Sequence, residues 1–540
     1  MRYVMVALVV FVPALLTATV QAALCESLTS VSIENGTIVK AEVVPEGPFV
    51  RPDSPAGEGR NSAAEPIPAH CRVTMVLTPT FDSHIGVELW LPSEDWNGRL
   101  LAVGNGWFAG SIQGYGDMQV ALRRGYATVA TDTGHSAADG PGAMFGLAHP
   151  EKIIDFAYRA VHDMTVKSKR IIDAFYNEPL SYSYFKGCST GGRQAVMAAQ
   201  RFPGDFDGII AGAMANRHIH MHTARVARGI RVARNPDETI SAEQAQMVTE
   251  AVMSKCDTLG EGFLNNPRQC TFDFSSLLCG GGTRSGGASS GSDGATDGGI
   301  TVGANGATDG SAMSNNRSAS GGQCLTKAQL RTVETWYGGV KNGKGEMIFS
   351  GQALGNPMGE VLAFGVSDAP YLVAQYDTVR IWGFQDAEYD WHDFDLDRDM
   401  PIIDTATGFV DADNPDLRGF KAHGGKLLLY AGWSDTNITP ENTVHYYESV
   451  LEEIGEDQAD WMRLFMVPGM GHCDGGPGVN TFDSITAIQQ WREGGTAPDQ
   501  IMASDPHAGL TRPLCPYPQY ARYNGSGSLA DASNWSCAAR

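Results

Sequence analysis

Basic side chains are scarce in this sequence of 540 residues. It contains 39 Lys and Arg against 61 Asp and Glu, which gives a formal net charge of −22. Nucleic-acid binding requires a basic surface that displaces counterions from phosphates, and the sequence has no such stretch. The composition therefore predicts a chain that stays dispersed in water and has no nucleic-acid partner.

Long apolar runs are also scarce. One occurs at the N-terminus, where Arg2 precedes "VMVALVVFVPALL" and the small-residue pattern Val20-Gln21-Ala22 follows. This order is typical of a cleaved secretory signal, and the short length of the run argues against the alternative, a membrane anchor. We therefore predict a signal peptide over 1–22 and a secreted protein, periplasmic or extracellular, without a membrane partner.

Cysteine is infrequent, but its number is even. An exported chain with ten cysteines is expected to form five disulfides. The sequence alone does not fix their connectivity, and Cys188 and Cys473 are left over when nearest neighbours are paired. The neighbouring pairs are Cys25 with Cys71, Cys256 with Cys270, Cys279 with Cys324, and Cys515 with Cys537.

Short apolar runs that end in turn residues alternate with helical patterns in the first part of the chain. The helical spacing of apolar residues is clearest over 151–176. Such alternation predicts a mostly parallel sheet with helices on both faces. The strand candidates are 98–104, 126–132, 181–187 and 207–212.

The alternation then stops, and buried-strand runs resume only with "GKLLLYAGWSD" and "MRLFMVPGMGHC". A sheet interrupted by a long insertion explains this order. We predict a catalytic domain over 23–214 and 421–540, with a lid domain over 215–420. Within the lid, the Gly- and Ser-rich composition of 280–322 predicts a flexible loop.

The stretch Gly187-Cys188-Ser189-Thr190-Gly191 fits G-x-S-x-G, in which a serine occupies a tight turn between a strand and a helix. A serine hydroxyl needs a histidine base and a carboxylate that orients it. Asp435 and His472 each follow a predicted strand, at the sheet edge where such folds hold their sites. The pattern predicts an α/β-hydrolase fold with an inserted lid and a triad of Ser189, Asp435 and His472.

Two potential nucleophiles stand side by side in this motif. Cys188 precedes Ser189 and Cys473 follows His472, so a Cys188–Cys473 disulfide would tie the nucleophile to the base. We therefore interpret Ser189 as the nucleophile. The alternative, Cys188 as a catalytic thiolate, would require a reduced thiol of low pKa.

A developing oxyanion needs preorganised backbone donors. We expect one from the N–H of Thr190, the residue after the nucleophile. A second is expected from the turn "VGNGWFAGS", around Gly106 and Trp107, for which the alternative is an ordinary tight turn.

Three segments, "GCSTGGRQ", "GWSDTNITP" and "VPGMGHC", together resemble the tannase and feruloyl esterase family. Further similar segments, such as "AQRFPGDFDGIIAGAMAN" and "VRIWGFQDAEYDWHDFD", cover the catalytic domain and reach into the lid. The resemblance implies the same triad and the same Cys188–Cys473 disulfide. It also implies hydrolysis of aromatic esters: feruloyl or other hydroxycinnamoyl esters, galloyl esters of tannins, or a terephthalate monoester.

No motif chooses among these acyl groups, and two other functions are considered. A protein of another class could bind phenolic glycans on a hydrolase scaffold without turning them over, but an intact triad argues against it. The same triad could also serve a peptidase or amidase.

Members of the family carry an Asp-rich calcium loop in the lid, and the corresponding stretch here is "CDTLGEGFLNNPRQC". The resemblance thus implies a structural calcium at Asp257, with Glu261 in place of another ligand, although the loop is shorter and other acids are missing. Hydrolysis of the ester itself needs no organic cofactor or metal.

Several other polar and aromatic residues have structural alternatives. In "HIHMH", His218 and His222 would share a helix face, and we expect incidental histidines rather than metal ligands. Asp132 and His135 end a predicted strand, where we expect a hydrogen-bond network. Four lid aromatics either line a pocket or form the lid core: Trp382, Phe384, Tyr389 and Trp391.

Overall fold

The computed structural model describes residues 24–52, 65–280, 324–358, 375–455 and 457–539. The predicted signal peptide and, apart from residue 280, the predicted flexible loop lie outside the described residues. No helix in the described segments is both long and apolar enough to cross a membrane.

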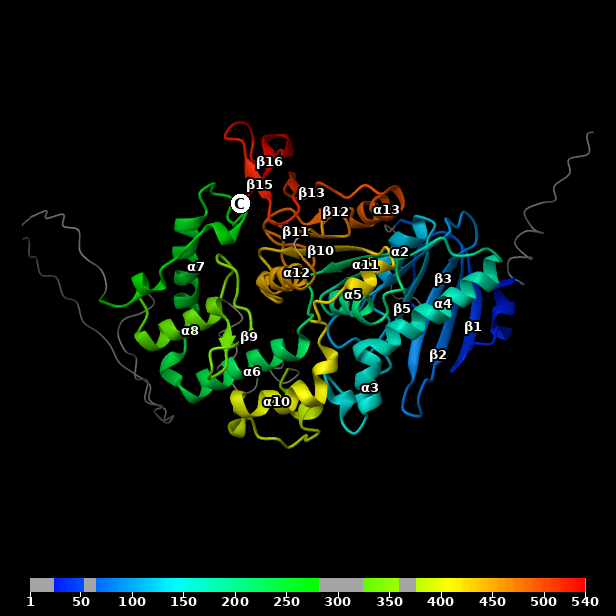
Figure 1. Cartoon of the computed structure of the whole chain (residues 1–540), viewed down its shortest axis with the longest axis horizontal. Helices are drawn as coiled ribbons and strands as arrows, with labels where there is room; N and C mark the ends of the chain where they lie inside the picture. The colour runs from blue at the N-terminus through cyan, green and yellow to red at the C-terminus, as the bar shows by residue number, and fades with distance from the viewer. Residues whose placement is uncertain (1–23, 53–64, 281–323, 359–374, 456, 540) are drawn as a thin grey trace, which may run out of the picture.

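In the described part of the chain, nine strands form a central sheet in the order β1-β2-β3-β5-β4-β6-β7-β10-β11 (Figure 1). From β5 to β11 the neighbours run parallel, whereas β1, β2, β3 and β5 pair antiparallel. The mostly parallel sheet is thus confirmed, with an antiparallel extension. The strands are β1 (Gly36–Val44), β2 (His70–Leu77), β3 (Ile85–Pro92), β4 (Arg99–Val103), β5 (Ala127–Thr131), β6 (Tyr182–Cys188), β7 (Gly208–Gly212), β10 (Lys426–Gly432) and β11 (Met462–Val467).

Helices cover both faces of this sheet. On one face lie α4, α5 and α12, and on the other lie α2 and α13. The helical pattern predicted over 151–176 is one continuous helical segment that includes a π-helical turn over Asp155–Arg159. The bounds are α2 (Tyr115–Arg123), α3 (Pro150–Ile154), α4 (Ala160–Tyr176), α5 (Thr190–Arg201), α11 (Arg418–Ala422), α12 (Pro440–Ile454) and α13 (Ser484–Gly494).

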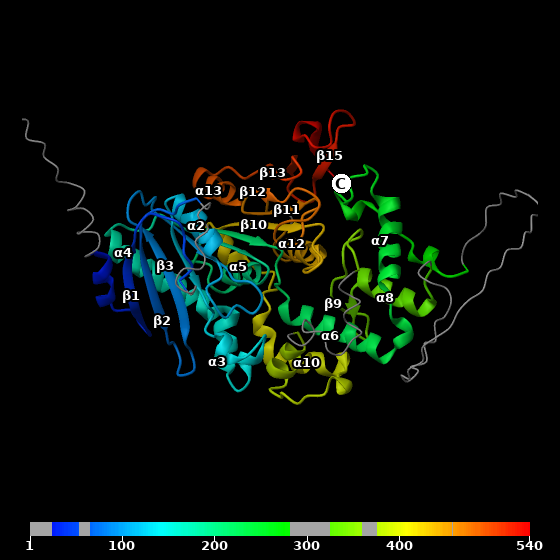
Figure 2. The ribbon, with the colours of Figure 1, turned by 180° about the vertical axis from the view of Figure 1, so that it is seen from behind.

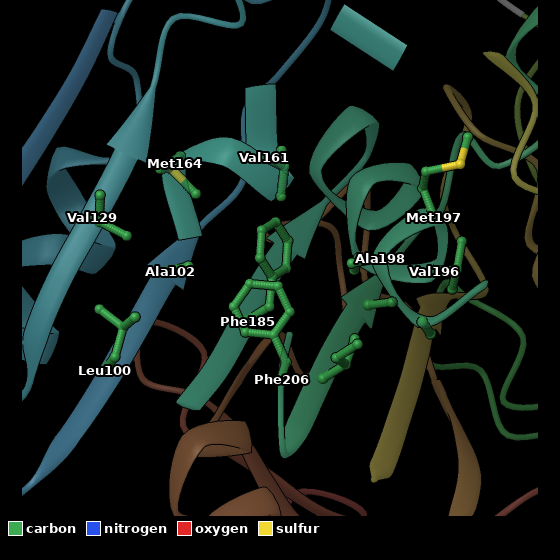
Figure 3. Packing of buried hydrophobic residues seen from close by; sticks show 14 of the residues in the cluster. Leu100, Ala102, Val129, Val161, Met164, Phe185, Val196, Met197, Ala198 and Phe206 are labelled. Carbon is green, nitrogen blue, oxygen red and sulfur yellow. The ribbon is translucent and has the colours of Figure 1, made fainter. Parts of the chain in front are cut away.

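Successive strand residues face opposite helix layers. Leu100 and Ala102 of β4 pack in the core beneath α4 and α5, whereas Leu101 between them packs on the α13 side. Figure 3 shows this first layer, with Leu100 and Ala102 of β4, Phe185 of β6 and Met164 of α4 as members of one buried cluster. Because both faces are covered, the parallel strands are apolar almost throughout, which is why the sequence shows them as short continuous runs.

The chain between β7 and β10 leaves the sheet and forms a separate group of helices beside it (Figures 1 and 2). One buried cluster, around Trp336, is formed within these helices. A second, around Trp382, is shared with the first part of the chain, which contributes Phe145 and Phe156. We use the name lid for residues 215–420, the bounds predicted from the sequence. Its elements are α6 (His218–Arg234), α7 (Ala242–Cys256), α8 (Lys327–Gly338), β8 (Val340–Lys341), β9 (Met347–Phe349) and α10 (Leu396–Thr407).

The C-terminal residues form small antiparallel sheets that the sequence did not predict. One is β12-β13-β14 and the other is β15-β16. Their bounds are β12 (Thr481–Phe482), β13 (Ile501–Asp505), β14 (Leu510–Leu514), β15 (Tyr520–Tyr523) and β16 (Trp535–Ala538).

All ten cysteines lie in described segments, and they form the five disulfides that the sequence predicts. Four join near neighbours in the sequence, whereas Cys188–Cys473 spans a sequence separation of 285. The other pairs are Cys25–Cys71, Cys256–Cys270, Cys279–Cys324 and Cys515–Cys537.

Candidate active site

Ser189 lies between β6 and α5 in a backbone conformation that non-glycine residues rarely adopt, with φ 64° and ψ −122°. The turn is held because the Ser189 N–H donates to the Gly212 carbonyl at 3.0 Å. A side chain at Gly187 would place a Cβ 2.4 Å from the carbonyl oxygen of Gly191. The glycines of G-x-S-x-G are therefore required for this close approach, and the turn matches the nucleophile geometry predicted from the motif.

Asp435 and His472 follow β10 and β11, the next two parallel strands beyond β7. The Asp435 carboxylate is completely buried, and Nδ1 of His472 donates to its Oδ2 at 2.8 Å. Its Oδ1 accepts hydrogen bonds from the N–H groups of Asn437 and Ile438 at 2.8 and 2.9 Å. Three hydrogen bonds thus fix the Asp435 carboxylate, and one of them also orients the His472 ring. Because Nδ1 of His472 carries the N–H, its Nε2 is left to accept a proton.

The Cys188–Cys473 disulfide connects the two halves of this constellation. It joins the residue before Ser189 to the residue after His472, with the two Cα atoms 5.9 Å apart. A thiolate role for Cys188 would require this bond to be reduced.

A cavity of about 790 Å³ lies over the carboxyl ends of the strands, and Ser189, His472 and both cysteines line it. The Ser189 hydroxyl forms no hydrogen bond to His472 within the described residues. Such catalytic hydrogen bonds are often long in a free enzyme and shorten when the substrate binds. The cavity therefore brings together the predicted nucleophile and base in one accessible space.

Two predicted oxyanion donors border the same cavity. Thr190 is the first residue of α5, where backbone N–H groups lack partners within the helix. Its side chain donates to the carbonyl of Trp107 at 2.5 Å, which joins the helix to the predicted turn. The N–H of Gly106, however, already donates to the side-chain carbonyl of Gln113 at 2.8 Å. Gly106 can serve an oxyanion only if Gln113 gives way.

The lid supplies part of the cavity wall that the sequence did not identify. Helix α6 contributes four side chains to the same cavity that Ser189 and His472 line: His218, Met221, His222 and Arg225. Burial lowers the pKa of His218 and of His222 well below the usual value, so both rings are neutral. In the sequence, only the helical spacing of positions 218, 222 and 225 indicated that these side chains share one face of a helix. Among the described residues no cluster of three or more potential ligands forms a metal site.

The other candidates from the sequence lie outside the wall of this cavity. Asp132 accepts hydrogen bonds from the N–H groups of Gly86 and Gly134 at 2.9 and 2.8 Å, and His135 stacks on Phe145 with ring centroids 3.7 Å apart. The expected hydrogen-bond network is present at Asp132. The lid aromatics form hydrophobic packing rather than cavity wall, with Trp382 fully buried and the others packed around the same cluster: Phe384, Tyr389 and Trp391.

The residues of the expected calcium loop are occupied by protein donors. Asp257 accepts hydrogen bonds from three backbone N–H groups, those of residues 260 to 262. Glu261 pairs with Arg512 at 2.7 Å, and this guanidinium also donates to Asn265 at 2.5 Å. A calcium ion needs six to eight oxygen ligands, whereas here a cationic side chain already holds the second acid. The donor set therefore does not fit calcium.

A mostly parallel sheet with a serine on a strand-to-helix turn, and a buried Asp–His pair after later strands, defines an α/β-hydrolase. The comparisons with known proteins agree. The profile of the family described as tannase and feruloyl esterase matches residues 71–538. The crystal structure of feruloyl esterase B from Aspergillus oryzae has a TM-score of 0.77 at 27% identity, covering 96% of this chain and 100% of that chain.

Two curated relatives are similar over almost the whole chain. An uncharacterized esterase of Xanthomonas campestris pv. campestris is 35% identical, over 97% of this chain and 92% of that protein. A mono(2-hydroxyethyl) terephthalate hydrolase of Piscinibacter sakaiensis is 30% identical, over 96% of this chain and 92% of that protein. This chain belongs to the tannase and feruloyl esterase family, and it is a carboxylic ester hydrolase.

Proposed function

We propose that this protein is a secreted serine esterase that hydrolyses esters of aromatic acids, with feruloyl and other hydroxycinnamoyl esters as its preferred substrates. One observation carries the proposal: Ser189 lines the same cavity as His472, whose Nδ1 is bonded to the buried carboxylate of Asp435. Five disulfides and the predicted signal peptide support export.

The proposed reaction begins when Oγ of Ser189 attacks the ester carbonyl carbon. Nε2 of His472 takes the hydroxyl proton, and the Asp435 carboxylate stabilises the imidazolium that forms. The C–O bond to the alcohol then breaks as His472 returns the proton to the leaving oxygen. Water, activated by the same histidine, hydrolyses the acyl-serine and releases the acid. No step uses a metal or organic cofactor.

The negative charge of the tetrahedral intermediate would face the beginning of α5. The N–H of Thr190 is the first proposed donor, and the positive end of the helix dipole favours charge at this position. The second donor is assigned to the turn at Gly106 and Trp107. Substrate binding would have to displace the Gln113 carbonyl if Gly106 itself donates.

The choice of aromatic acyl groups rests on the cavity and on the relatives. A volume of about 790 Å³ suits a substrate of aromatic-ester size. Its wall contains apolar side chains such as Val103, Val120 and Ile438 beside the neutral histidines of the lid. A related protein is a feruloyl esterase, and another is a mono(2-hydroxyethyl) terephthalate hydrolase.

Initial rates on four esters test the proposal: methyl ferulate, methyl caffeate, methyl gallate and mono(2-hydroxyethyl) terephthalate. We expect the highest kcat/KM on methyl ferulate or methyl caffeate and loss of the rate in Ser189→Ala. A Ser189-dependent preference for gallate or terephthalate would reassign the acyl group. The anilide of ferulic acid, at equal concentration, tests for amidase activity.

Absence of turnover on all five compounds, with folded and oxidised protein, would reject the esterase function. Binding of methyl ferulate without turnover would instead support a non-catalytic phenolic-binding protein. Gln113→Asn tests the Gly106 donor and is not a neutral control, since Gln113 lines the cavity and the variant keeps an amide but shortens its reach to Gly106. It is expected to alter the rate far less than Ser189→Ala.

A further inference from the structure

Residues of α6, α8, β8 and the turn before α10 line a second cavity, of about 540 Å³, in the lid. It shares no lining residue with the catalytic cavity. Five cationic side chains line it against two carboxylates, although the whole chain carries a formal charge of −22. The cationic residues are Arg228, Arg231, Arg234, Arg331 and Lys341.

A buried carboxylate organises two of these arginines. Glu238, whose side chain is 5% exposed, accepts hydrogen bonds from Nε of Arg231 at 2.9 Å and from Nε of Arg331 at 2.9 Å. Burial alone would raise the pKa of Glu238, but the two guanidinium groups outweigh this effect and lower it. One negative charge thus holds two positive charges in place, and their outer N–H groups reach the surface, with side-chain exposures of 43% and 48%.

Arg234 and Lys341 add positive charge with no carboxylate partner among the described residues. Nη2 of Arg234 donates to the carbonyl oxygens of His392 and Phe394, at 2.6 and 2.9 Å, so neutral groups position this guanidinium. Lys341 projects from β8 at the exposed rim. An arginine fixed by neutral acceptors keeps its charge and its remaining N–H groups for a bidentate anion.

The acidic and apolar parts of the wall limit what the cavity can hold. Glu334 and Asp395 reduce the excess of positive charge, and Asp395 is engaged as the cap of α10, where it accepts the N–H of Arg398 at 2.9 Å. Ile230 and Phe394 are buried and form an apolar floor. A small excess of positive charge above an apolar floor suits a ring that carries a single negative charge.

We infer that this lid cavity binds an organic monocarboxylate, with Arg234 and Arg331 holding the carboxylate and the apolar floor holding the ring. Two sources have this chemistry. One is the aromatic acid released by the reaction, an assignment that rests on the proposed function. The other is a uronic acid, a sugar ring that also carries a single carboxylate, and this assignment does not depend on the chemistry at Ser189.

Calorimetric titration with sodium ferulate and with D-galacturonate distinguishes these sources, with methyl ferulate as the uncharged control. The protein is first treated with phenylmethylsulfonyl fluoride, which would block the catalytic cavity through Ser189. We expect one acid to bind and its affinity to fall by about tenfold or more in the Arg234→Gln/Arg331→Gln double variant, because charge-assisted hydrogen bonds are lost. Arg418→Gln, on an exposed arginine of α11, is the matched control and should bind as the wild type does.

Lys341→Glu provides a second test, because no ion pair within the described residues holds the fold through this lysine. It should weaken binding by a similar factor while circular dichroism and Tm stay unchanged. Binding of neither acid, or equal affinity in wild type and double variant, overturns the inference. Loss of galacturonate binding in the double variant would support it even if the protein proved to have no esterase activity.

Discussion

Cys188 and Cys473 are bonded to each other, and each is the immediate sequence neighbour of a proposed catalytic residue, Ser189 or His472. The disulfide therefore joins the last residue of β6 to the loop that follows β11. The N–H of Ser189 bonds to Gly212 of β7, whereas His472 lies beyond the end of β11, and this disulfide is the covalent bond between the residues next to them. A disulfide at this position acts on geometry as well as on stability.

Removing this disulfide in a Cys188→Ala/Cys473→Ala variant should lower kcat more than it raises KM. A displacement of the nucleophile by about 1 Å can cost about 100-fold in rate, so we expect a fall between about tenfold and 100-fold. The measurement is steady-state kinetics on the best ester from the substrate comparison.

The matched control is Cys515→Ala/Cys537→Ala, which removes a disulfide that lies outside the cavity wall. It should lower Tm and leave kcat unchanged at a temperature where the protein is folded. Equal effects of the two double variants on kcat would show that the Cys188–Cys473 bond contributes to stability alone.

Asp435→Asn should leave the fold intact and reduce kcat by about 10⁴-fold, because an amide favours the wrong tautomer of the histidine and cannot stabilise an imidazolium. The N–H groups of Asn437 and Ile438 can still bond to the side-chain oxygen of asparagine. KM should change little, since Asp435 is fully buried. Steady-state kinetics measures the change in kcat and KM, and Tm of the same sample checks that the fold is intact. A kcat within tenfold of wild type would remove Asp435 from the proposed triad.

The proposed catalytic residues could be picked out from the sequence because each lies in a short local pattern. Ser189 follows a strand and precedes a helix within a glycine-rich motif, and His472 follows the apolar run that becomes β11. The contribution of Arg225 to the cavity was not predicted, because it depends on how the lid packs over the sheet. The same is true of Gln113, whose contact with Gly106 is set by the conformation of one loop.

The antiparallel strands β1, β2 and β3 were also missed. Only Ile38 and Ala41 are buried in β1, and buried residues alternate with partly buried ones along β2, so neither strand is a continuous apolar run in the sequence. Such alternation gives a weaker signal than the continuous apolar runs of β4 or β10. The poor fit of the lid turn to calcium could not be predicted for another reason. It depends on the pairing of Glu261 with Arg512, which lies far along the chain.

Asp132 predicts a pH dependence of stability. Burial raises its pKa to about 7 from an ordinary value of 3.8, against the lowering effect of two backbone hydrogen bonds, and the nearby Asp155 raises it further. The folded protein thus keeps this proton up to about pH 7, whereas the unfolded chain releases it near 3.8. Its contribution to stability is therefore complete below about pH 4 and is lost as the pH rises to 7.

Asp132→Asn should remove this dependence. The amide oxygen can still accept the N–H groups of Gly86 and Gly134, and the variant carries no charge at any pH. Since a change of one in pKa corresponds to about 1.4 kcal/mol, we expect the variant to exceed the wild type by more than about 1 kcal/mol at pH 8, and this advantage to shrink steadily as the pH falls to about 4. Urea denaturation at pH 8 and at pH 4 measures it, and a constant difference would contradict the raised pKa.

The Glu261–Arg512 pair predicts that the lid turn needs no calcium. Both side chains are buried, with exposures of 6% and 1%, and the guanidinium also bonds to Asn265 and to the backbone carbonyl of Leu529 at 3.1 Å. The pair thus connects the lid turn to the C-terminal sheets. Removing one partner of a buried ion pair leaves the other charge uncompensated and costs about 3–5 kcal/mol.

We therefore expect EDTA to leave Tm and kcat of the wild type unchanged, and Arg512→Gln to lower the free energy of unfolding by about 3 kcal/mol. Glu261→Gln/Arg512→Gln should recover part of the loss, because neither charge is then left unpaired. Arg418→Gln, whose side chain is 53% exposed, is the control and should cost less than about 1 kcal/mol. If EDTA lowered Tm and added calcium restored it, the protein would bind calcium, and the Glu261–Arg512 pair would not replace the ion.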